Sequence, residues 1–156
     1  STPQPNPWQA DGYRFFAEQR LLYQARLARR RNLIEAADLA QVEGLAARLP
    51  DLVPEQPAAL LHGDLWTGNA ASDSAGRPAL IDPAAYYGWA EAELAMTTLF
   101  GSFPAEFYAA YEEARPLAPG YRGRFDLYNL YHLLNHVNLF GRGYLGQVQA
   151  ILRRYR

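Results

Sequence analysis

The chain has 156 residues, about half of them apolar, with a net charge of −1 and no Cys. This length allows one domain or two small lobes, and the apolar share is large enough to bury a core. The charge balance gives no electrostatic affinity for nucleic acid or membranes, and the missing Cys excludes disulfides, thiolate catalysis and cysteine-ligated zinc.

All fifteen basic residues are Arg, so the chain contains no Lys. A phosphate-binding loop of the G-x-x-x-x-G-K-[ST] type is therefore excluded. The same absence excludes a Schiff-base lysine and the strand lysine with which protein kinases hold ATP. Because no run of about 18 apolar residues and no signal peptide is recognisable, we expect a cytoplasmic protein without a membrane partner.

Proline and apolar spacing divide the first third of the chain. Residues 1–10 carry three prolines, which predict an extended lead-in rather than a helix. Apolar residues then recur near helical spacing over residues 11–33 and again over residues 33–49. A cluster of prolines after Leu49 ends this helical part.

Two short apolar runs predict the β structure. Ala58–Leu61 and Pro78–Ile81 flank a small polar turn, so we expect a hairpin within residues 58–82. After Gly88 the pattern is helical, and the expected helices cover residues 91–101, 104–113, 123–140 and 143–156. The predicted fold class is therefore α+β, mainly helical, with one small β-hairpin.

The motif HGDLWTGN, residues 62–69, indicates phosphoryl transfer. This reaction needs a carboxylate that accepts the proton of the attacking hydroxyl, and oxygen ligands for Mg²⁺. Asp64 and Asn69 have the D-x-x-x-x-N spacing of a kinase catalytic loop, and Asp82 follows the second expected strand. Because a hairpin would bring these strand ends together, we expect all three side chains to face one metal site. The alternative is an ordinary Asx turn beside an ordinary strand end.

Three neighbours of Asp64 are candidates for support or substrate contact. We expect His62 to brace the loop through hydrogen bonds, and Gly63 to allow a backbone geometry that a Cβ forbids. Trp66 lies between the expected base and the first metal ligand. It either forms a wall for the acceptor or packs under the loop.

Polar residues in the expected helices give weaker signals. Glu91 and Glu93 open a helix, where they cap it, brace the loop or contact substrate. His132 and His136 lie four residues apart on a helix that is apolar nearly all round. We expect a buried, hydrogen-bonded polar stripe, with His136 as a candidate wall of the substrate pocket. A zinc site is disfavoured because no carboxylate lies nearby on that face.

Three blocks of the chain closely resemble the C-terminal part of the fructosamine kinases, also called ketosamine-3-kinases. The blocks are HGDLWTGN, LIDPAAYYGWAEAELAMTTLFGSF and LYNLYHLLNHVNLFGRGY. This family belongs to the aminoglycoside phosphotransferase and choline kinase group, which has a protein-kinase-like fold. The resemblance implies that residues 11–156 are a helical C-terminal lobe. Residues 1–10 would then lead in from an N-terminal ATP-binding lobe.

The resemblance also implies the chemistry. Asp64 would be the base, and Asn69 and Asp82 would hold the Mg²⁺ that positions ATP as the co-substrate. The reaction would phosphorylate the 3-hydroxyl of a ketosamine, free or protein-bound, whose product then releases the amine and so repairs glycation.

The chain departs from the family in two ways. It has no Lys for the nucleotide, so we interpret it as one lobe of a longer enzyme, weakly active alone and prone to self-association. Trp89 and Ala90 also replace the His or Asp and the Arg that usually precede Glu91. Two alternatives remain: another kinase of the group, acting on an aminoglycoside, choline or homoserine-like hydroxyl, or a non-catalytic pseudokinase-like lobe.

Overall fold

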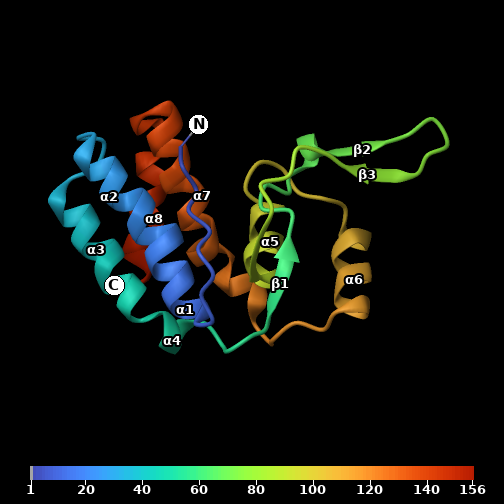
Figure 1. Ribbon diagram of the computed structural model, residues 1–156, viewed down its shortest axis with the longest axis horizontal. Coiled ribbons are helices and arrows are strands. Elements are labelled where there is room, and N and C mark those ends of the chain that lie inside the picture. Colours follow the sequence, from blue (N-terminus) through green and yellow to red (C-terminus); the bar gives the residue numbers. More distant parts are fainter. Residues whose placement is uncertain (1) are drawn as a thin grey trace. The chain divides into compact units, whose positions relative to one another are not determined.

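The computed structural model describes residues 2–156, so residue 1 of the expected lead-in lies outside the described residues (Figure 1). The chain divides into two compact units, residues 1–55 with 129–156 and residues 56–128. It is mostly helical with two small two-stranded sheets, as the predicted α+β class requires. None of the helices described within residues 2–156 has the length and apolar character needed to cross a membrane.

The first unit begins with one continuous helical stretch, as predicted for residues 11–33. The Asp11 side chain caps it by accepting a hydrogen bond from the Arg14 N–H at 3.0 Å. The periodicity did not predict that the middle of this stretch is a π-helix. Its three parts are α1 (Gly12–Phe15), the π-helix Phe16–Leu22 and α2 (Tyr23–Arg30).

A buried arginine fastens the lead-in to this helix. Arg20 is fully buried, and its guanidinium lies over the rings of Phe15 and Tyr131. It donates hydrogen bonds to the Pro5 carbonyl at 3.0 Å and to the Asn6 side-chain oxygen at 2.6 Å. The described part of the lead-in is therefore extended, as predicted, and docked onto its own unit.

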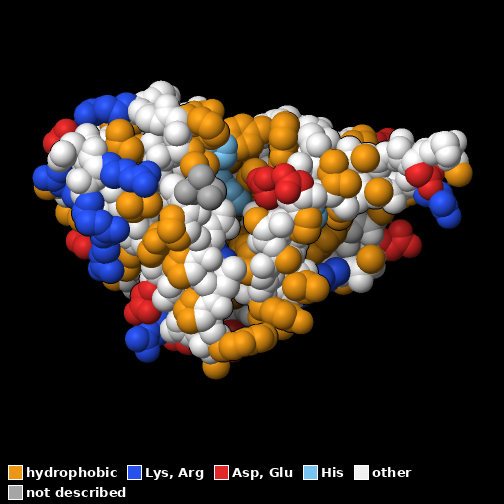
Figure 2. Space-filling model, turned by 45° about the horizontal axis from the view of Figure 1, so that its top comes forward, with side chains coloured by type: hydrophobic (Ala, Val, Ile, Leu, Met, Phe, Trp, Pro, Cys, Tyr) orange, Lys and Arg blue, Asp and Glu red, His pale blue; other side chains and the backbone are white. Residues whose placement is uncertain are grey.

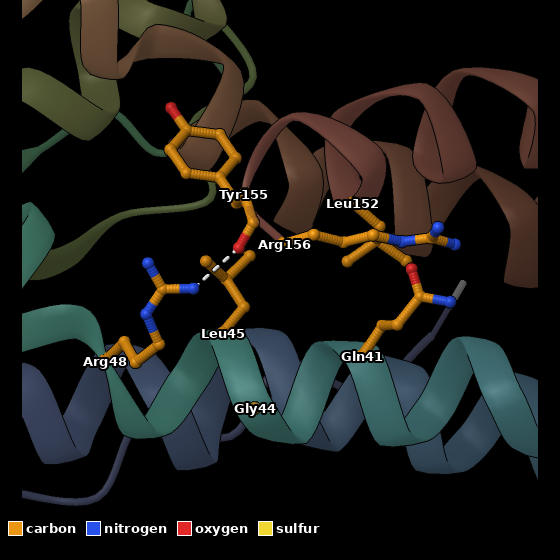
Figure 3. A pocket seen from close by; sticks show the side chains of 7 residues that line it. All are labelled: Gln41, Gly44, Leu45, Arg48, Leu152, Tyr155 and Arg156. Atoms are coloured by element: carbon orange, nitrogen blue, oxygen red, sulfur yellow. Dashed lines mark hydrogen bonds between the residues drawn. The ribbon is translucent and has the colours of Figure 1, made fainter.

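The second predicted helix, over residues 33–49, corresponds to α3 (Ala36–Ala47). The short helix α4 (Leu49–Leu52) follows it and includes Pro50, so the helical part does not end at the first proline as predicted, because proline is tolerated in the first turn of a helix. In the first unit α3 packs against α2 and against α8 (Leu145–Arg154), and Gln149 of α8 donates to Asp38 of α3 at 3.0 Å. A groove of about 180 Å³ lies between α3 and α8, and Arg48 closes one end by donating to the Tyr155 carbonyl at 2.8 Å (Figure 3). It is lined by none of the predicted site residues.

The long helix α7 (Phe125–Phe140) follows a 3-10 turn, Tyr121–Arg124, and passes along the chain from the second unit into the first. It confirms the helix predicted over residues 123–140. Its apolar side chains are buried as far as Val137, which accounts for its nearly uniform hydrophobic pattern, whereas Leu139 and Phe140 at its end are exposed. The fully buried members include Leu127, Tyr128, Leu130, Leu134 and Val137.

The strands of the second unit do not pair as predicted. β1 (Ala58–Leu61) pairs antiparallel with β4 (Tyr86–Trp89), and β2 (Ala70–Ser72) pairs with β3 (Pro78–Leu80). The predicted hairpin between residues 58–61 and 78–81 is therefore wrong. The cause is local: the Asp73 side chain accepts hydrogen bonds from the Ala75 and Arg77 N–H groups and closes a tight turn. β3 consequently pairs with the segment just before this turn, in the hairpin that extends to the right in Figure 1.

Two helices complete the second unit, α5 (Ala90–Met96) and α6 (Ala105–Ala114). Every residue of α5 is buried, and the helix packs against both β1 and β4. It ends five residues earlier than predicted, where the Thr97 hydroxyl bonds to the Leu94 carbonyl at 2.6 Å and to the Tyr108 hydroxyl at 2.9 Å. α6 confirms the helix predicted over residues 104–113.

Candidate active site

A turn of three residues, His62–Asp64, follows β1 directly and presents Asp64. Gly63 has φ +83°, and a Cβ at this position would lie 2.1 Å from the Ala84 carbonyl oxygen. Only glycine fits here, because a side chain would meet backbone that cannot move aside. The Ala84 N–H donates to the His62 carbonyl at 2.8 Å, so the turn is held against the segment that follows Asp82.

The His62 side chain contacts both this turn and the segment before Asp82. Its Nε2 lies 3.0 Å from the Ile81 carbonyl oxygen, and its Nδ1 lies 3.4 Å from the Asp64 backbone nitrogen. Because a carbonyl oxygen only accepts, Nε2 must carry the ring proton, and Nδ1 accepts a long hydrogen bond from the Asp64 N–H. The imidazole therefore joins Asp64 to the residue immediately before Asp82.

Asn69 is buried beside Asp64 and turned towards it. Its side-chain nitrogen donates to the Asp64 carbonyl at 2.8 Å and to the Asp64 carboxylate oxygen Oδ2 at 3.1 Å. A 3-10 turn, Thr67–Asn69, returns the chain to Asp64 and so explains the five-residue spacing. Since the amide nitrogen is used in this way, the amide oxygen is the atom that can ligate a cation.

The segment that carries Asp82 contacts the segment that carries Asn69. The Ile81 N–H donates to the Asn69 carbonyl at 3.0 Å, which places Asp82 one residue beyond that contact. Asp82 is exposed and has φ +54°, a left-handed conformation that Asp tolerates better than most residues. Backbone contacts thus bring the segments of Asp64, Asn69 and Asp82 together, although by a different strand pairing from the predicted one.

These residues fit Mg²⁺ better than a metal that needs several His, Cys or acidic ligands. Residues 2–156 contain no group of three or more such side chains that could hold a metal. Mg²⁺ differs in that it keeps several waters and takes one or two carboxylates together with substrate phosphates. One amide oxygen and one exposed carboxylate, from Asn69 and Asp82, match that requirement.

Trp66 folds back over its own loop. A Cβ at Gly68 would lie 2.3 Å from the far edge of the indole, so the ring covers the space that this glycine leaves. This arrangement favours the packing interpretation of Trp66. The indole is partly exposed, and its role as an acceptor wall stays a prediction.

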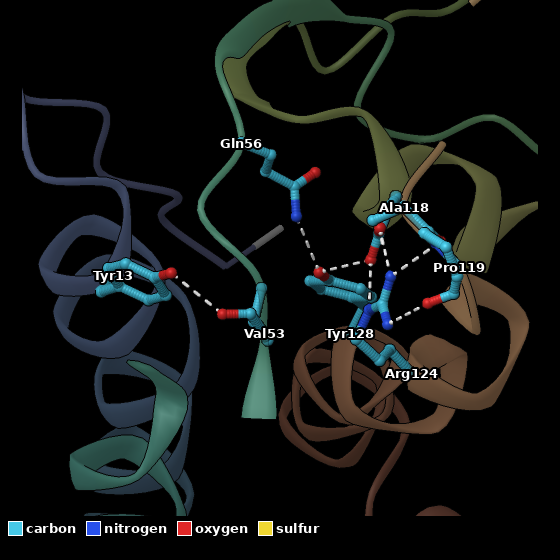
Figure 4. A network of polar contacts seen from close by, with 8 residues as sticks. Tyr13, Val53, Gln56, Ala118, Pro119, Arg124 and Tyr128 are labelled. Atoms are coloured by element: carbon cyan, nitrogen blue, oxygen red, sulfur yellow. Dashed lines mark hydrogen bonds and ion pairs between the residues drawn. The ribbon is translucent and has the colours of Figure 1, made fainter. Parts of the chain in front are cut away.

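Glu91 is a structural support, and its carboxylate binds an arginine. Its two oxygens accept hydrogen bonds from Arg124 at 2.6 and 2.7 Å, and Tyr128 donates to it at 2.9 Å. Figure 4 shows Arg124 also reaching the Ala118 and Pro119 carbonyls. Desolvation and the neighbouring Glu91 charge raise the pKa of the Tyr128 hydroxyl above its usual range. Glu91 therefore fastens α5 to the 3-10 turn before α7.

Glu93 is the acidic residue of α5 that contacts the His62–Asp64 turn. Its carboxylate accepts the His62 N–H at 3.1 Å and the Gly63 N–H at 3.0 Å. Burial raises the pKa of this carboxyl, and the two N–H bonds oppose that rise. The sequence placed Glu91 and Glu93 together at a helix start, but residues two apart on a helix point to different sides. Only the strand pairing decides which one meets the turn.

The two histidines of α7 belong to the first unit. His132 is buried, and desolvation, with smaller effects of His136 and Arg20, lowers its pKa to about 3. His136 bonds through Nδ1 to the His132 carbonyl at 2.8 Å and lies against the rings of Phe140 and Tyr144. The role of His136 in a substrate pocket stays a prediction.

The predicted polar stripe of α7 is confirmed in part, because His132 and Asn135 are buried whereas His136 is only half-buried. Asn135 accepts a hydrogen bond from the Thr2 hydroxyl, and the Asn138 side chain donates to the Gln24 backbone and side-chain oxygens at 2.9 Å. These buried amides join α7 to the lead-in and to α2 within the first unit.

Comparison with known proteins identifies the family. Residues 1–156 match the family model described as fructosamine kinase. The chain belongs to the fructosamine kinase family. It is 51% identical to the Synechocystis protein named "probable ketoamine kinase", an alignment that covers 99% of this chain and 52% of that relative. It is 44% identical to the mouse ketosamine-3-kinase, over 97% of this chain and 49% of the mouse protein.

Solved structures agree with this membership. A Thermobifida fusca protein assigned as a fructosamine-3-kinase superposes with a TM-score of 0.91 at 38% identity, covering 97% of this chain and 53% of that one. The chain thus spans about half the length of the relatives that it matches in this family.

Proposed function

We propose that this chain is the catalytic and acceptor-binding part of an ATP-dependent fructosamine (ketosamine) 3-kinase. The observation that carries the proposal is the contact of the Asn69 amide nitrogen with Asp64, which leaves the amide oxygen for a cation beside Asp82. In this proposal residues 11–156 form the C-terminal lobe of a protein-kinase-like fold. Residues 1–10 connect it to an N-terminal ATP-binding lobe, which relatives of twice the length have room for.

Asp64 would act as the base for the attacking sugar hydroxyl. Its Oδ2 is fixed by the Asn69 amide, so the carboxylate is oriented before the acceptor binds. The proton of the acceptor's 3-hydroxyl passes to this carboxylate as the oxygen attacks the γ-phosphate of ATP, and ADP leaves. Bound Mg²⁺ would neutralise phosphate charge in this step, held by the Asn69 oxygen and the Asp82 carboxylate.

The charge of the second unit suits an acceptor that carries an amine. Residues 56–128 contain nine acidic residues and four Arg, and three of these Arg pair with Asp73, Glu112 and Glu91. The first unit has the opposite balance, with eleven Arg and seven acidic residues, and Figure 2 shows Arg side chains gathered on its surface. The excess of acidic residues in this unit favours a cationic ketosamine over a neutral sugar.

Relatives support a glycated amine as the acceptor. The rice relative, 44% identical, is named protein-ribulosamine 3-kinase, so a protein-bound sugar adduct belongs to the proposed acceptors alongside free ketosamines. Trp66 and His136 are the proposed acceptor contacts. The proposed location is the cytoplasm, and the proposed partner is the upstream lobe of the same enzyme.

A polycationic acceptor is the second candidate, because the same excess of acidic residues would attract an aminoglycoside. The experiment is therefore a competition of acceptors. ADP formation is measured with Mg²⁺ and ATP for fructosyl-lysine, choline and an aminoglycoside, both with this chain and with the chain extended by its upstream residues. The matched variants are Asp64→Asn and, as a control that leaves the motif intact, Asp73→Asn.

We expect turnover with fructosyl-lysine alone, greater in the extended chain, abolished by Asp64→Asn and retained by Asp73→Asn. Turnover with choline or the aminoglycoside instead would assign the chain to another kinase of the group. An extended chain that is folded and silent with every acceptor would support the non-catalytic lobe.

A further inference from the structure

We propose that Glu93 is a positioning residue that sets the orientation of Asp64 by holding the two peptide N–H groups before it. The hold of Glu93 on the turn follows from the contacts alone. The expected effect of Glu93 on catalysis rests on the proposed function. Glu93 lies in α5, and only 8% of its surface is exposed.

The contact is a two-point clamp. One carboxylate oxygen accepts the His62 N–H at 3.1 Å, and the other accepts the Gly63 N–H at 3.0 Å. Hydrogen bonds to a charged acceptor are about twice as strong as neutral ones. Because consecutive amides are bound by one rigid group, the orientation of the peptide that leads into Asp64 is fixed by α5.

The opposite side of the turn is closed by backbone. The Ala84 N–H binds the His62 carbonyl at 2.8 Å, and the Ala84 carbonyl occupies the space that a Cβ of Gly63 would need. The turn is therefore held between α5 and the segment after Asp82. Glu93 contributes its carboxylate to this arrangement, and a substitution can remove that carboxylate without adding bulk.

Burial of this carboxylate is unfavourable, which argues against a purely stabilising role. Desolvation raises the Glu93 pKa, and the nearby Asp64 charge adds to the rise, whereas the bonds from His62 and Gly63 lower it. A buried charge is often replaceable by an apolar group at no loss of stability. What an apolar group cannot supply is two acceptor oxygens for adjacent N–H groups.

Glu91 provides a matched control within the same helix. It is also a buried carboxylate, two residues earlier, but it binds Arg124 and Tyr128 rather than the turn. Glu91→Gln removes the same charge from α5 without touching the His62 or Gly63 N–H. A difference between the two variants therefore reports on the turn and not on the helix.

The first measurement does not depend on kinase activity. In ¹⁵N-labelled chain, Glu93→Gln should move the amide protons of His62 and Gly63 upfield and speed their exchange with solvent, because an amide offers one acceptor oxygen instead of two. Glu91→Gln should leave both signals in place. The proposal is overturned if Glu93→Gln leaves these two amides unchanged, or if Glu91→Gln shifts them equally.

The second measurement tests the catalytic consequence. With fructosyl-lysine as acceptor, Glu93→Gln should lower kcat about 100-fold, the loss that a displacement of about 1 Å produces, with little change in the KM for ATP. Glu91→Gln should keep its kcat per folded molecule. The rates are measured in the chain extended by its upstream residues. Equal kcat in both variants overturns the positioning role even where the amide signals move, and an extended parent chain that is folded but inactive contradicts the proposed function alone.

Glu93→Asp is the variant to measure if Glu93→Gln does not fold. It keeps the charge but shortens the side chain by one methylene, so it should retain one of the two amide contacts. We expect only one of the His62 and Gly63 signals to move, with kcat between those of the parent and Gln forms. Parent-like signals and parent-like kcat in a folded Asp variant would refute the clamp.

Discussion

In the proposed mechanism Asn69 uses its amide nitrogen to hold Asp64 and its amide oxygen to bind a cation, and this can be tested at the level of a single residue. Asn69→Asp keeps an oxygen for a cation but removes both donors to Asp64 and places a second carboxylate about 3 Å away. We expect the two carboxylates to repel each other, so that Asp64 is no longer held in its orientation. Activity should fall about 100-fold or more.

The measurements are Mn²⁺ affinity by calorimetry and the rate with fructosyl-lysine. Mn²⁺ binding should be kept or strengthened while the rate falls. An unchanged rate would show that the contact of the Asn69 amide with Asp64 does not orient the base.

His132 makes the stability of the chain depend on pH. Burial lowers its pKa to about 3 in the folded chain, against about 6.5 in the unfolded one. Between these values the unfolded state binds a proton that the folded state does not, so the free energy of unfolding falls as the pH falls. The loss should reach about 3 kcal/mol at pH 4.

Urea unfolding between pH 7 and pH 4 tests this contribution, with His132→Gln as the comparison. The variant lacks the titrating ring, so its stability should decline less steeply over the same range. Parallel curves for the two proteins would mean that His132 is protonated without cost in the folded state.

At the level of elements, α5 is secured by the buried Glu91–Arg124 pair. Glu91→Gln leaves Arg124 with a neutral partner in a site where Glu91 is only 2% exposed. Removing one member of a buried pair leaves an uncompensated charge, so we expect a loss of about 2–3 kcal/mol. Thermal and urea unfolding give the value, and a loss within about 0.5 kcal/mol would assign the fastening of α5 to its apolar packing instead.

The elements also show what the sequence could and could not predict. Helices α3, α6, α7 and α8 follow from apolar spacing, because a helix depends on neighbours within a few residues. The pairing of β1 with β4 joins residues 58 and 89, and no local signal distinguishes that partner from the nearer apolar run. Asp64, Asn69 and Asp82 are predicted because the proposed chemistry imposes a spacing, and the structure brings their segments together. Glu93 was left ambiguous because its role depends on the strand pairing.

At the scale of the whole molecule, the second unit exposes apolar side chains next to the candidate site. Leu60 and Tyr87 are cross-strand partners on the outer face of the β1–β4 pair, 66% and 54% exposed, and Leu80 and Ile81 are at least half exposed nearby in sequence to Asp82. Single exposed apolar residues are ordinary, but a paired group beside a site marks an interaction surface. The relatives are about twice as long, so we expect their additional half to cover this face.

The 156-residue chain alone should therefore self-associate, and extension by its upstream residues should suppress the association. Sedimentation velocity over a range of concentrations measures both forms, beside the double variant Leu60→Thr, Tyr87→Thr, in which polar β-branched residues suit the strands. Phe140→Thr is the control, because this residue is 66% exposed but belongs to the first unit. Monomers at all concentrations would contradict the predicted self-association. An equal reduction of the association by the control variant would place the contact on another surface. Relief by the double variant and by extension alike would show that one face serves both contacts.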